Sequence, residues 1–222
     1  RRMAHRGASV SLSIRHQDPH IVVVEKPYGL PSQGTQDVSQ DHLFAQVKAR
    51  FPQAALHHRL DTPASGLVLF TVHPSANKGI AEAFRTRRIT RRYLAVVAGD
   101  PGPEGTWSAS LDEKTAVTHF ERLGSSGGMA LLEVRIETGR THQIRRHAAM
   151  AGHPILGDRR HGGVAGGLWT RLALHAVSLQ LTHPISGRLL RVSSPLPPDL
   201  VGLMAPLSQA LDRRYSPETA TD

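Results

Sequence analysis

Short apolar stretches bounded by proline or glycine recur along the whole chain and predict a fold built mainly of strands. The clearest is the β-branched run 21–24, which a turn containing proline and glycine follows. Residues 129–137 alternate apolar and charged side chains, which predicts a strand with one face in water. Further strands are expected at residues 66–72, 93–98, 117–123, 172–181 and 189–193.

Four segments with helical spacing lie among these strands, at residues 41–51, 75–88, 141–150 and 198–211. Ser75 and Thr141 are the expected N-caps of the second and third. The strict strand–helix alternation of a doubly wound sheet is absent, so the pattern predicts an α+β fold with a mixed sheet. Residues 101–105 and the glycine-rich stretch 162–167 are interpreted as loops, the second of them flexible.

The chain of 222 residues has the length of one domain. We expect that domain at residues 19–212. A basic arm or edge strand would precede it at residues 1–18, and a flexible tail would follow at 213–222. The arm is too short to fold as a separate module, so any selection of a partner would rest on the domain's own surface.

Charge and composition narrow the classes of function. Lys plus Arg number 27 against 18 Asp plus Glu, and the net charge of +9 favours a polyanionic partner. The absence of cysteine excludes disulfide scaffolds, thiolate metal sites and cysteine nucleophiles. No apolar run approaches the roughly 20 residues that span a bilayer, and no signal peptide opens the sequence. These features predict a soluble, cytoplasmic protein without a membrane partner.

The segment 57–66 carries a carboxylate in a setting suited to catalysis. Asp61 follows Arg59 and precedes a proline-containing turn, ahead of an expected strand. A neighbouring cation keeps such a carboxylate ionised and fit to act as a nucleophile or base. Aspartate before a turn is also ordinary turn chemistry, so these residues alone leave both interpretations open.

Two arginine-rich segments, 87–93 and 138–147, suit a phosphate-bearing ligand. In the second, Arg145 follows Thr141 by one helical turn, and a helix N-terminus with arginines can bind phosphate oxygens. In the first, four arginines precede Tyr93 in the sequence. Arginines that contact phosphates, beside an aromatic ring that stacks on a base, can hold that base outside the helical stack. A solvated basic helix and a packed tyrosine are the plainer alternatives.

Fourteen histidines raise the question of a metal site. His142, His147, His153 and His161 lack the compact spacing of metal ligands, and no HExxH motif is present. There is no phosphate-binding loop either. We therefore expect neither a metal nor a nucleotide cofactor.

Taken in order, these segments resemble the RluA-type family of RNA pseudouridine synthases. Each piece alone is weak, but the ordered set is highly specific and spans residues 21–198. It consists of Glu25-Lys26-Pro27-Tyr28-Gly29-Leu30, His58-Arg59-Leu60-Asp61, Ser65-Gly66-Leu67, residues 92–99, 138–145 and 152–158, Leu174-His175-Ala176, His183-Pro184 and Pro195-Leu196-Pro197.

The resemblance implies a mixed, mostly antiparallel sheet with flanking helices, a central catalytic cleft, and no metal or cofactor. It also implies a reaction, in which the N1–C1′ bond of a uridine breaks, the uracil turns, and C5 joins C1′. Asp61 matches the essential aspartate, Tyr93 the aromatic residue against the base, and Arg145 the basic partner of the aspartate. The residues expected to contact RNA are His58, Arg59, Arg87, Arg88, Arg91, Arg140 and His142.

Three positions depart from the family's usual pattern. Ala64 stands where a threonine is common after the aspartate, Arg91 where a lysine is common, and His161 where a tyrosine is frequent. None of these changes removes a group expected to be catalytic.

The sequence leaves two alternative functions open. A catalytically silent RNA-binding protein could share the fold, although Asp61, Tyr93 and Arg145 are all present. A glycosidase or nucleoside hydrolase generally needs a second carboxylate, and no paired acid accompanies Asp61. We expect a monomer that acts on RNA and not DNA, with ribosomal RNA favoured over transfer RNA. The route that the aspartate takes, through C6, C1′ or a glycal, is left open.

Overall fold

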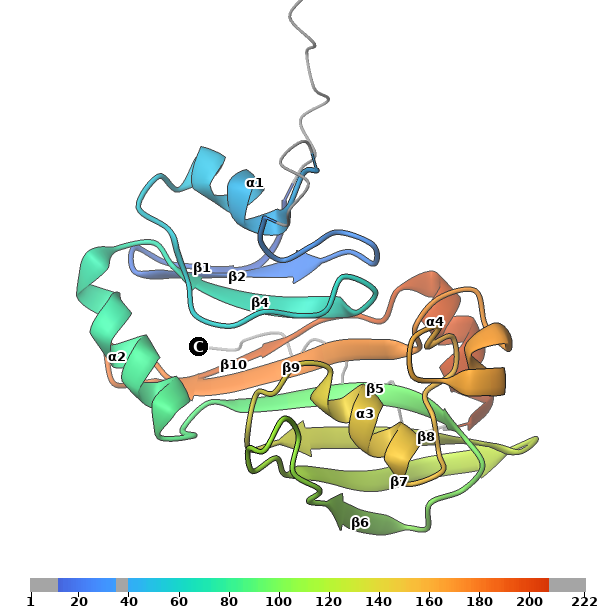
Figure 1. Cartoon of the computed structure of the whole chain (residues 1–222). Coiled ribbons are helices and arrows are strands. Elements are labelled where there is room, and N and C mark those ends of the chain that lie inside the picture. Colours follow the sequence, from blue (N-terminus) through green and yellow to red (C-terminus); the bar gives the residue numbers. More distant parts are fainter. Residues whose placement is uncertain (1–11, 35–39, 208–222) are drawn as a thin grey trace, which may run out of the picture.

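The computed structural model describes residues 12–34 and 40–207 (Figure 1). Most of the predicted arm and all of the predicted tail 213–222 lie outside these residues. The strands are β1 (Ser13–Gln17), β2 (Ile21–Lys26), β3 (Ala55–Leu56), β4 (Ser65–Thr71), β5 (Thr90–Ala98), β6 (Glu104–Trp107), β7 (Thr118–Ser126), β8 (Met129–Ile136), β9 (Leu174–Thr182) and β10 (Leu189–Ser193). The helices are α1 (Leu43–Arg50), α2 (Pro74–Arg85), α3 (Gln143–Met150) and α4 (Pro198–Met204), with 3₁₀ turns at Gly163–Gly167 and Ala205–Leu207.

Within the described residues the strands form one mixed sheet in the order β1-β2-β4-β9-β5-β8-β7-β6, with β10 beside β9 and β3 beside β4. Every pairing is antiparallel except that of β4 with β9. The prediction of an α+β fold with a mixed, mostly antiparallel sheet and flanking helices is confirmed. No helix in the described ranges has the length and apolar composition needed to cross a bilayer.

The junction of β4 and β9 determines where a cleft can form. The two strands pair only through Ser65 with His175 and Gly66 with Ala176. Beyond this point the two parts of the sheet diverge, as Figure 1 shows. A Cβ atom on Gly66 would lie 2.3 Å from the Ala176 carbonyl oxygen, and the φ of Gly66 is +114°. This close approach requires glycine at the junction.

The apolar core lies on both faces of the sheet. In β2, Val22 and Val24 pack into the larger cluster, while Ile21 and Val23 face a second cluster beneath α2. The helix contributes Ala76 and Ile80 to that second cluster. The uninterrupted β-branched run in β2 is therefore explained by burial of both faces.

Two predicted helix caps were wrong. Helix α2 begins at Pro74, and the His73 ring accepts the backbone N–H of Ser75, so Ser75 lies inside the helix. Helix α3 begins at Gln143, after His142, whose φ of +53° is left-handed. Thr141 therefore lies outside the helix and does not cap it.

Other differences follow from tertiary packing. The predicted wet face of residues 129–137 is confirmed only in part: Arg135 is exposed, but Leu131 and Glu133 are buried. The glycine-rich stretch forms a 3₁₀ turn rather than a flexible loop. Strand β6 begins inside the predicted loop 101–105, and β3 was not predicted. The last predicted helix ends at Met204, and residues 208–211 lie outside the described chain.

The structure describes only part of the segment expected as an arm or edge strand. Ser13–Gln17 form β1, an edge strand that pairs with β2. Residues 1–11 lie outside the described residues.

Candidate active site

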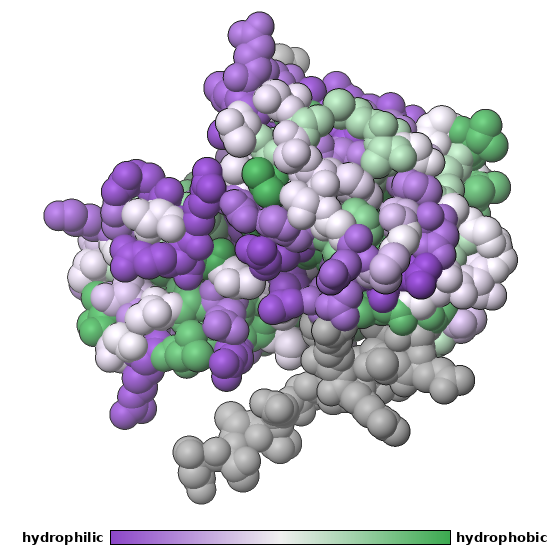
Figure 2. Space-filling view, turned by 90° about the horizontal axis from the view of Figure 1, so that it is seen from below, coloured by the Kyte–Doolittle hydropathy of each residue, from purple (hydrophilic) through white to green (hydrophobic). Residues whose placement is uncertain are grey.

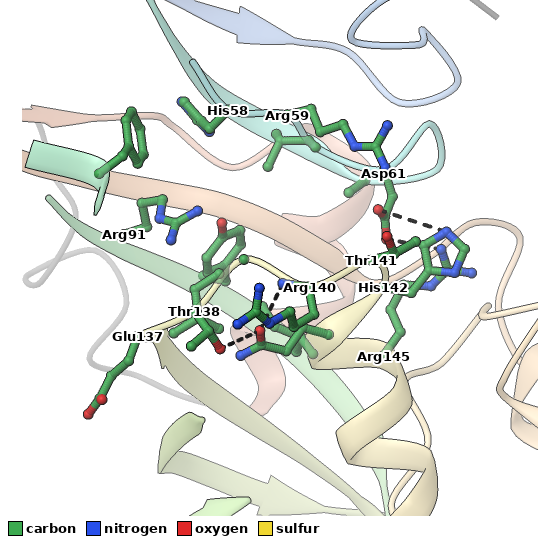
Figure 3. A pocket seen from close by; sticks show the side chains of 18 of the residues that line it. His58, Arg59, Asp61, Arg91, Glu137, Thr138, Arg140, Thr141, His142 and Arg145 are labelled. Atoms are coloured by element: carbon green, nitrogen blue, oxygen red, sulfur yellow. Dashed lines mark hydrogen bonds and ion pairs between the residues drawn. The ribbon is translucent and has the colours of Figure 1, made fainter. Parts of the chain in front are cut away.

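A pocket of about 420 Å³ opens where the two parts of the sheet diverge. One wall comes from the loop 57–64, which leads into β4. The other comes from β5 and from the segment 136–145, which joins β8 to α3. In Figure 3, Asp61, His142 and Arg145 lie near one another at one end, while His58 and Arg91 lie toward the other. The volume suits a ligand of nucleotide size.

Asp61 projects into the pocket from a tight turn, in which the backbone N–H of Ala64 donates to the Asp61 carbonyl at 3.0 Å. Arg145 Nη1 donates to Asp61 Oδ2 at 3.0 Å. The aspartate side chain remains 22% exposed. The Asp61 carboxylate is thus held by a cation and is still accessible to solvent. A substrate in the pocket can therefore reach it as well.

Arg145 is fixed from behind by a second carboxylate. Its Nε and Nη2 donate to the two oxygens of Asp158, at 2.8 and 2.7 Å, and the Asp158 side chain is fully buried. Burial works against the charge of Arg145, but the hydrogen bonds that it donates to Asp158 and Asp61 prevail and raise its pKa. Burial alone would raise the pKa of Asp158, yet Arg145 lowers it. Asp158 thus holds the guanidinium in the orientation that presents Nη1 to Asp61.

Gln143, rather than a conventional cap, anchors the start of α3. Its Oε1 accepts from the Thr138 hydroxyl at 2.7 Å and from the Arg140 backbone N–H at 3.0 Å. Its Nε2 donates to the Val117 carbonyl oxygen at 2.9 Å. This buried amide ties the loop before α3 to Val117, just ahead of β7, and so sets the position of Arg145 two residues later.

Tyr93 lies in the middle of β5 and is almost fully buried, and its ring lines the pocket. Burial raises the pKa of Tyr93, and the nearby guanidinium of Arg91 opposes that shift only in part. The phenol is therefore protonated at neutral pH. Arg91 also lies over the Phe84 ring, 5.5 Å from its centroid.

His58 is held as a neutral ring. Its Nε2 accepts the backbone N–H of Leu69 at 2.9 Å, so the ring proton resides on Nδ1. Burial, together with Arg91 and His57, lowers the pKa of His58 to about 3. His58 lines the pocket without adding charge to it.

The other predicted RNA contacts divide into two groups. Arg59, Arg87 and Arg140 line the pocket, and Arg87 Nη1 also lies 3.3 Å from Glu137 Oε2. Arg88 is exposed but not among the lining residues, and its Nε donates to the Thr86 hydroxyl at 2.9 Å.

Lys26 secures the loop that carries Asp61. The side chain is fully buried, and its Nζ donates to the carbonyl oxygens of Pro27, Leu30 and Thr62 at 3.0, 2.7 and 3.1 Å. Burial lowers the pKa of Lys26 to about 7, while Asp61 opposes the shift.

Lys26→Met should lower the free energy of unfolding by about 3 kcal/mol, because three carbonyl groups lose a donor that lies in the protein interior. Urea unfolding measures the change, with Lys78→Met as the matched control, since Lys78 is exposed on α2. Equal stability of the two variants would contradict this role for Lys26.

One group of three possible metal ligands occurs in the described chain, outside the pocket: Asp18, His20 and His183. Asp18 Oδ1 accepts backbone N–H groups of His20 and Ile21. His183 Nδ1 accepts backbone N–H groups of residues 185 and 186, so its proton resides on Nε2, the nitrogen 3.1 Å from Asp18 Oδ2. These contacts identify a turn-stabilising cluster.

Comparison with known proteins connects this geometry to a family. The family model described as RNA pseudouridylate synthase matches residues 20–150. That range contains Asp61, Tyr93 and Arg145. The chain belongs to the RluA-type RNA pseudouridine synthases. As a pseudouridine synthase it is an RNA uridine isomerase.

Named relatives and solved structures agree. Ribosomal large subunit pseudouridine synthase D of Xanthomonas campestris pv. campestris is 35% identical over 90% of this chain and 70% of its own length. The uncharacterized RNA pseudouridine synthase YhcT of Bacillus subtilis is 32% identical over 86% of this chain and 71% of its own length. The structure of human RNA Pseudouridylate Synthase Domain Containing 1 matches with a TM-score of 0.74 and 27% identity, over 98% of both chains.

Sequence reasoning assigned no role in this synthase to Asp158, Gln143 or Lys26. A signal for Asp158 existed, because a buried guanidinium has more donors than one carboxylate can accept and so requires a second acceptor. The partners of Gln143 and Lys26 depend on how loops far apart in sequence meet, and local patterns do not contain that information.

Proposed function

We propose that this synthase isomerises specific uridines in ribosomal RNA and that Asp61 is the carboxylate that reacts with the nucleotide. Arg145 orients Asp61, Tyr93 packs against the target base, and Arg59 helps to keep the nucleotide out of the helical stack. The observation that carries this proposal is the Asp61–Arg145 contact at 3.0 Å, at the end of a pocket of nucleotide size.

The shape and charge of the pocket suit the chemistry. Both the glycosidic nitrogen and C5 of the base must be reached, so the base has to leave the stack and enter a pocket. The ring of Tyr93 offers a face for the base, and the protonated phenol adds no negative charge beside Asp61. The cations around the pocket suit the phosphates on either side of the flipped nucleotide.

The charge around the pocket supports an RNA partner. Arg59, Arg85, Arg87, Arg91 and Arg140 line it beside one glutamate, Glu137. In Figure 2, hydrophilic residues dominate the middle of the face shown, and apolar residues occur there in small groups. We propose that the domain binds RNA through the arginines that line the pocket, and that it does so as a monomer.

The choice of ribosomal RNA rests on the names of the relatives, several of which are ribosomal large subunit synthases. Unmodified ribosomal RNA and transfer RNA transcripts, incubated separately with the protein, test it. Pseudouridine is mapped by carbodiimide labelling and primer extension. Modification of a few positions in ribosomal RNA alone is expected, and modification of transfer RNA alone would overturn the choice.

Arg87→Glu with Arg88→Glu should weaken binding to every RNA by about tenfold or more and flatten its salt dependence, because fewer counterions are released. The two arginines are exposed at the end of α2, and only Arg87 lines the pocket. Affinity is measured by fluorescence anisotropy at salt concentrations from about 50 to about 200 mM, because electrostatic binding to nucleic acid weakens steeply over this range.

The matched control is Arg188→Glu with Arg191→Glu, which changes the net charge equally at exposed positions outside the pocket. The control should retain most of the affinity. If both double variants lose affinity equally, the effect is one of net charge, and the assignment of this surface is wrong.

A further inference from the structure

Asp61 has a second basic neighbour besides Arg145. His142 Nε2 lies 3.9 Å from Asp61 Oδ1, the oxygen that Arg145 does not contact. This distance is too long for a hydrogen bond, but a ring N–H group placed there still attracts the carboxylate electrostatically. Figure 3 shows the His142 ring beside the Asp61 carboxylate.

The other nitrogen of the His142 ring is engaged by a second histidine. His142 Nδ1 lies 2.9 Å from His161 Nε2, and the rings meet edge to face with centroids 5.1 Å apart. Two ring nitrogens at this distance share one proton, so one ring donates and the other accepts.

The charge of Asp61 decides which ring donates. If His142 donated through Nδ1, the lone pair on its Nε2 would face the carboxylate. If His161 donates, the proton of His142 lies on Nε2, and an N–H group faces the carboxylate instead. The second arrangement replaces a repulsion by an attraction.

We propose that His161 fixes the proton of His142 on Nε2, and that His142 thereby positions the Asp61 carboxylate for reaction with the nucleotide. The proposal rests on the proposed role of Asp61. His142 and His161 are positioning residues in this account, since they act through Asp61.

The backbone supports the arrangement from two sides. The backbone N–H of His161 donates to Asp158 Oδ1 at 3.1 Å, and the same carboxylate accepts hydrogen bonds from Arg145. Asp158 therefore holds both Arg145, which contacts Asp61, and the backbone of His161, whose ring contacts His142. His142 adopts a φ of +53°, which residues other than glycine rarely adopt, and this backbone directs its ring toward Asp61 and His161.

The charged groups around the pair favour neutral rings near pH 7. Burial lowers the pKa of both His142 and His161, and Arg145 and Arg160 add to the shift. The negative charge of Asp61 opposes the lowering of the His142 pKa, and that of Asp158 opposes the lowering of the His161 pKa. Arg146 lowers the His161 pKa further. A neutral pair is the state in which one proton links the rings.

Single-turnover and steady-state kinetics of pseudouridine formation test the proposal. His161→Phe keeps a ring but removes the donor, so kcat should fall by about tenfold while the KM for RNA stays within about twofold. His161→Gln places an amide N–H near the lost Nε2 and should restore most of kcat. His153→Phe, at a half-buried histidine outside the pocket, is the matched control and should behave as wild type.

Ring ¹⁵N NMR of the RNA-free protein tests the proton position without relying on activity. His142 should carry its proton on Nε2 in the wild type and show a mixture of both ring forms in His161→Phe. A wild-type proton on Nδ1 would overturn the proposal, as would a wild-type kcat for His161→Phe. If the wild-type protein formed no pseudouridine, the proposed function would fail, and the NMR result would still decide the proton position.

Discussion

Asp61→Asn should lower the rate of pseudouridine formation by about 10⁴-fold or more, because the amide cannot replace the reacting carboxylate. The variant should still fold, since the asparagine oxygen can accept from Arg145 Nη1 and the Arg145–Asp158 pair is unchanged. RNA affinity should change little, because the cations that line the pocket are retained.

The measurement is single-turnover formation of pseudouridine at saturating protein, with RNA affinity and thermal unfolding recorded for the same preparation. Asp112→Asn is the matched control, as Asp112 is an exposed partner of Arg146 outside the pocket. A rate for Asp61→Asn within tenfold of the wild type, with intact folding, would remove Asp61 from the chemistry.

Arg145→Met should both destabilise the protein and abolish detectable activity. The change leaves the fully buried carboxylate of Asp158 without its bidentate partner, and breaking a buried pair in this way costs about 3–5 kcal/mol. Backbone N–H groups of Arg160 and His161 still donate to one Asp158 oxygen and offset part of that cost. Asp61 loses the donor that orients it, so activity falls even in the folded fraction.

The pH dependence of stability separates this explanation from simple loss of packing. In the wild type Arg145 lowers the pKa of Asp158, so its contribution is present at neutral pH and is lost in acid. In the variant, burial without the arginine raises the pKa of Asp158, so the folded state takes up a proton as the pH falls. The difference in the free energy of unfolding between the wild type and Arg145→Met, measured in urea, should therefore become smaller as the pH falls from about 7 to about 5. If the stability difference did not change with pH, the buried charge of Asp158 would not be the cause of the destabilisation.

Sequence patterns predicted those features that depend on neighbouring residues. The buried strand β2 follows from its β-branched run. Arg145 beside Asp61 does not follow from a local pattern and was expected from the family resemblance. The caps of α2 and α3 were wrong for a chemical reason. Histidine is not a preferred N-cap, yet the His73 ring accepts a backbone N–H, and Gln143 replaces a cap at α3.

Features that depend on distant partners were not predictable locally. Glu133 alternates with apolar residues as an exposed side chain would, but Arg92 on the neighbouring β5 pairs with it and allows its burial. The contact of Arg145 with Asp158 requires the chain after α3 to return beneath the guanidinium. Neither pairing leaves a periodic trace in the sequence.

We expect this pocket to isomerise uridine without hydrolysing its glycosidic bond. The most direct measurement is release of tritium from C5-labelled uridine in ribosomal RNA, combined with chromatography of the nucleosides after digestion. Tritium leaves when C5 becomes the carbon joined to the sugar. Isomerisation should release one tritium for each pseudouridine formed and produce no free uracil. Free uracil, or bound RNA with no tritium release, would contradict it.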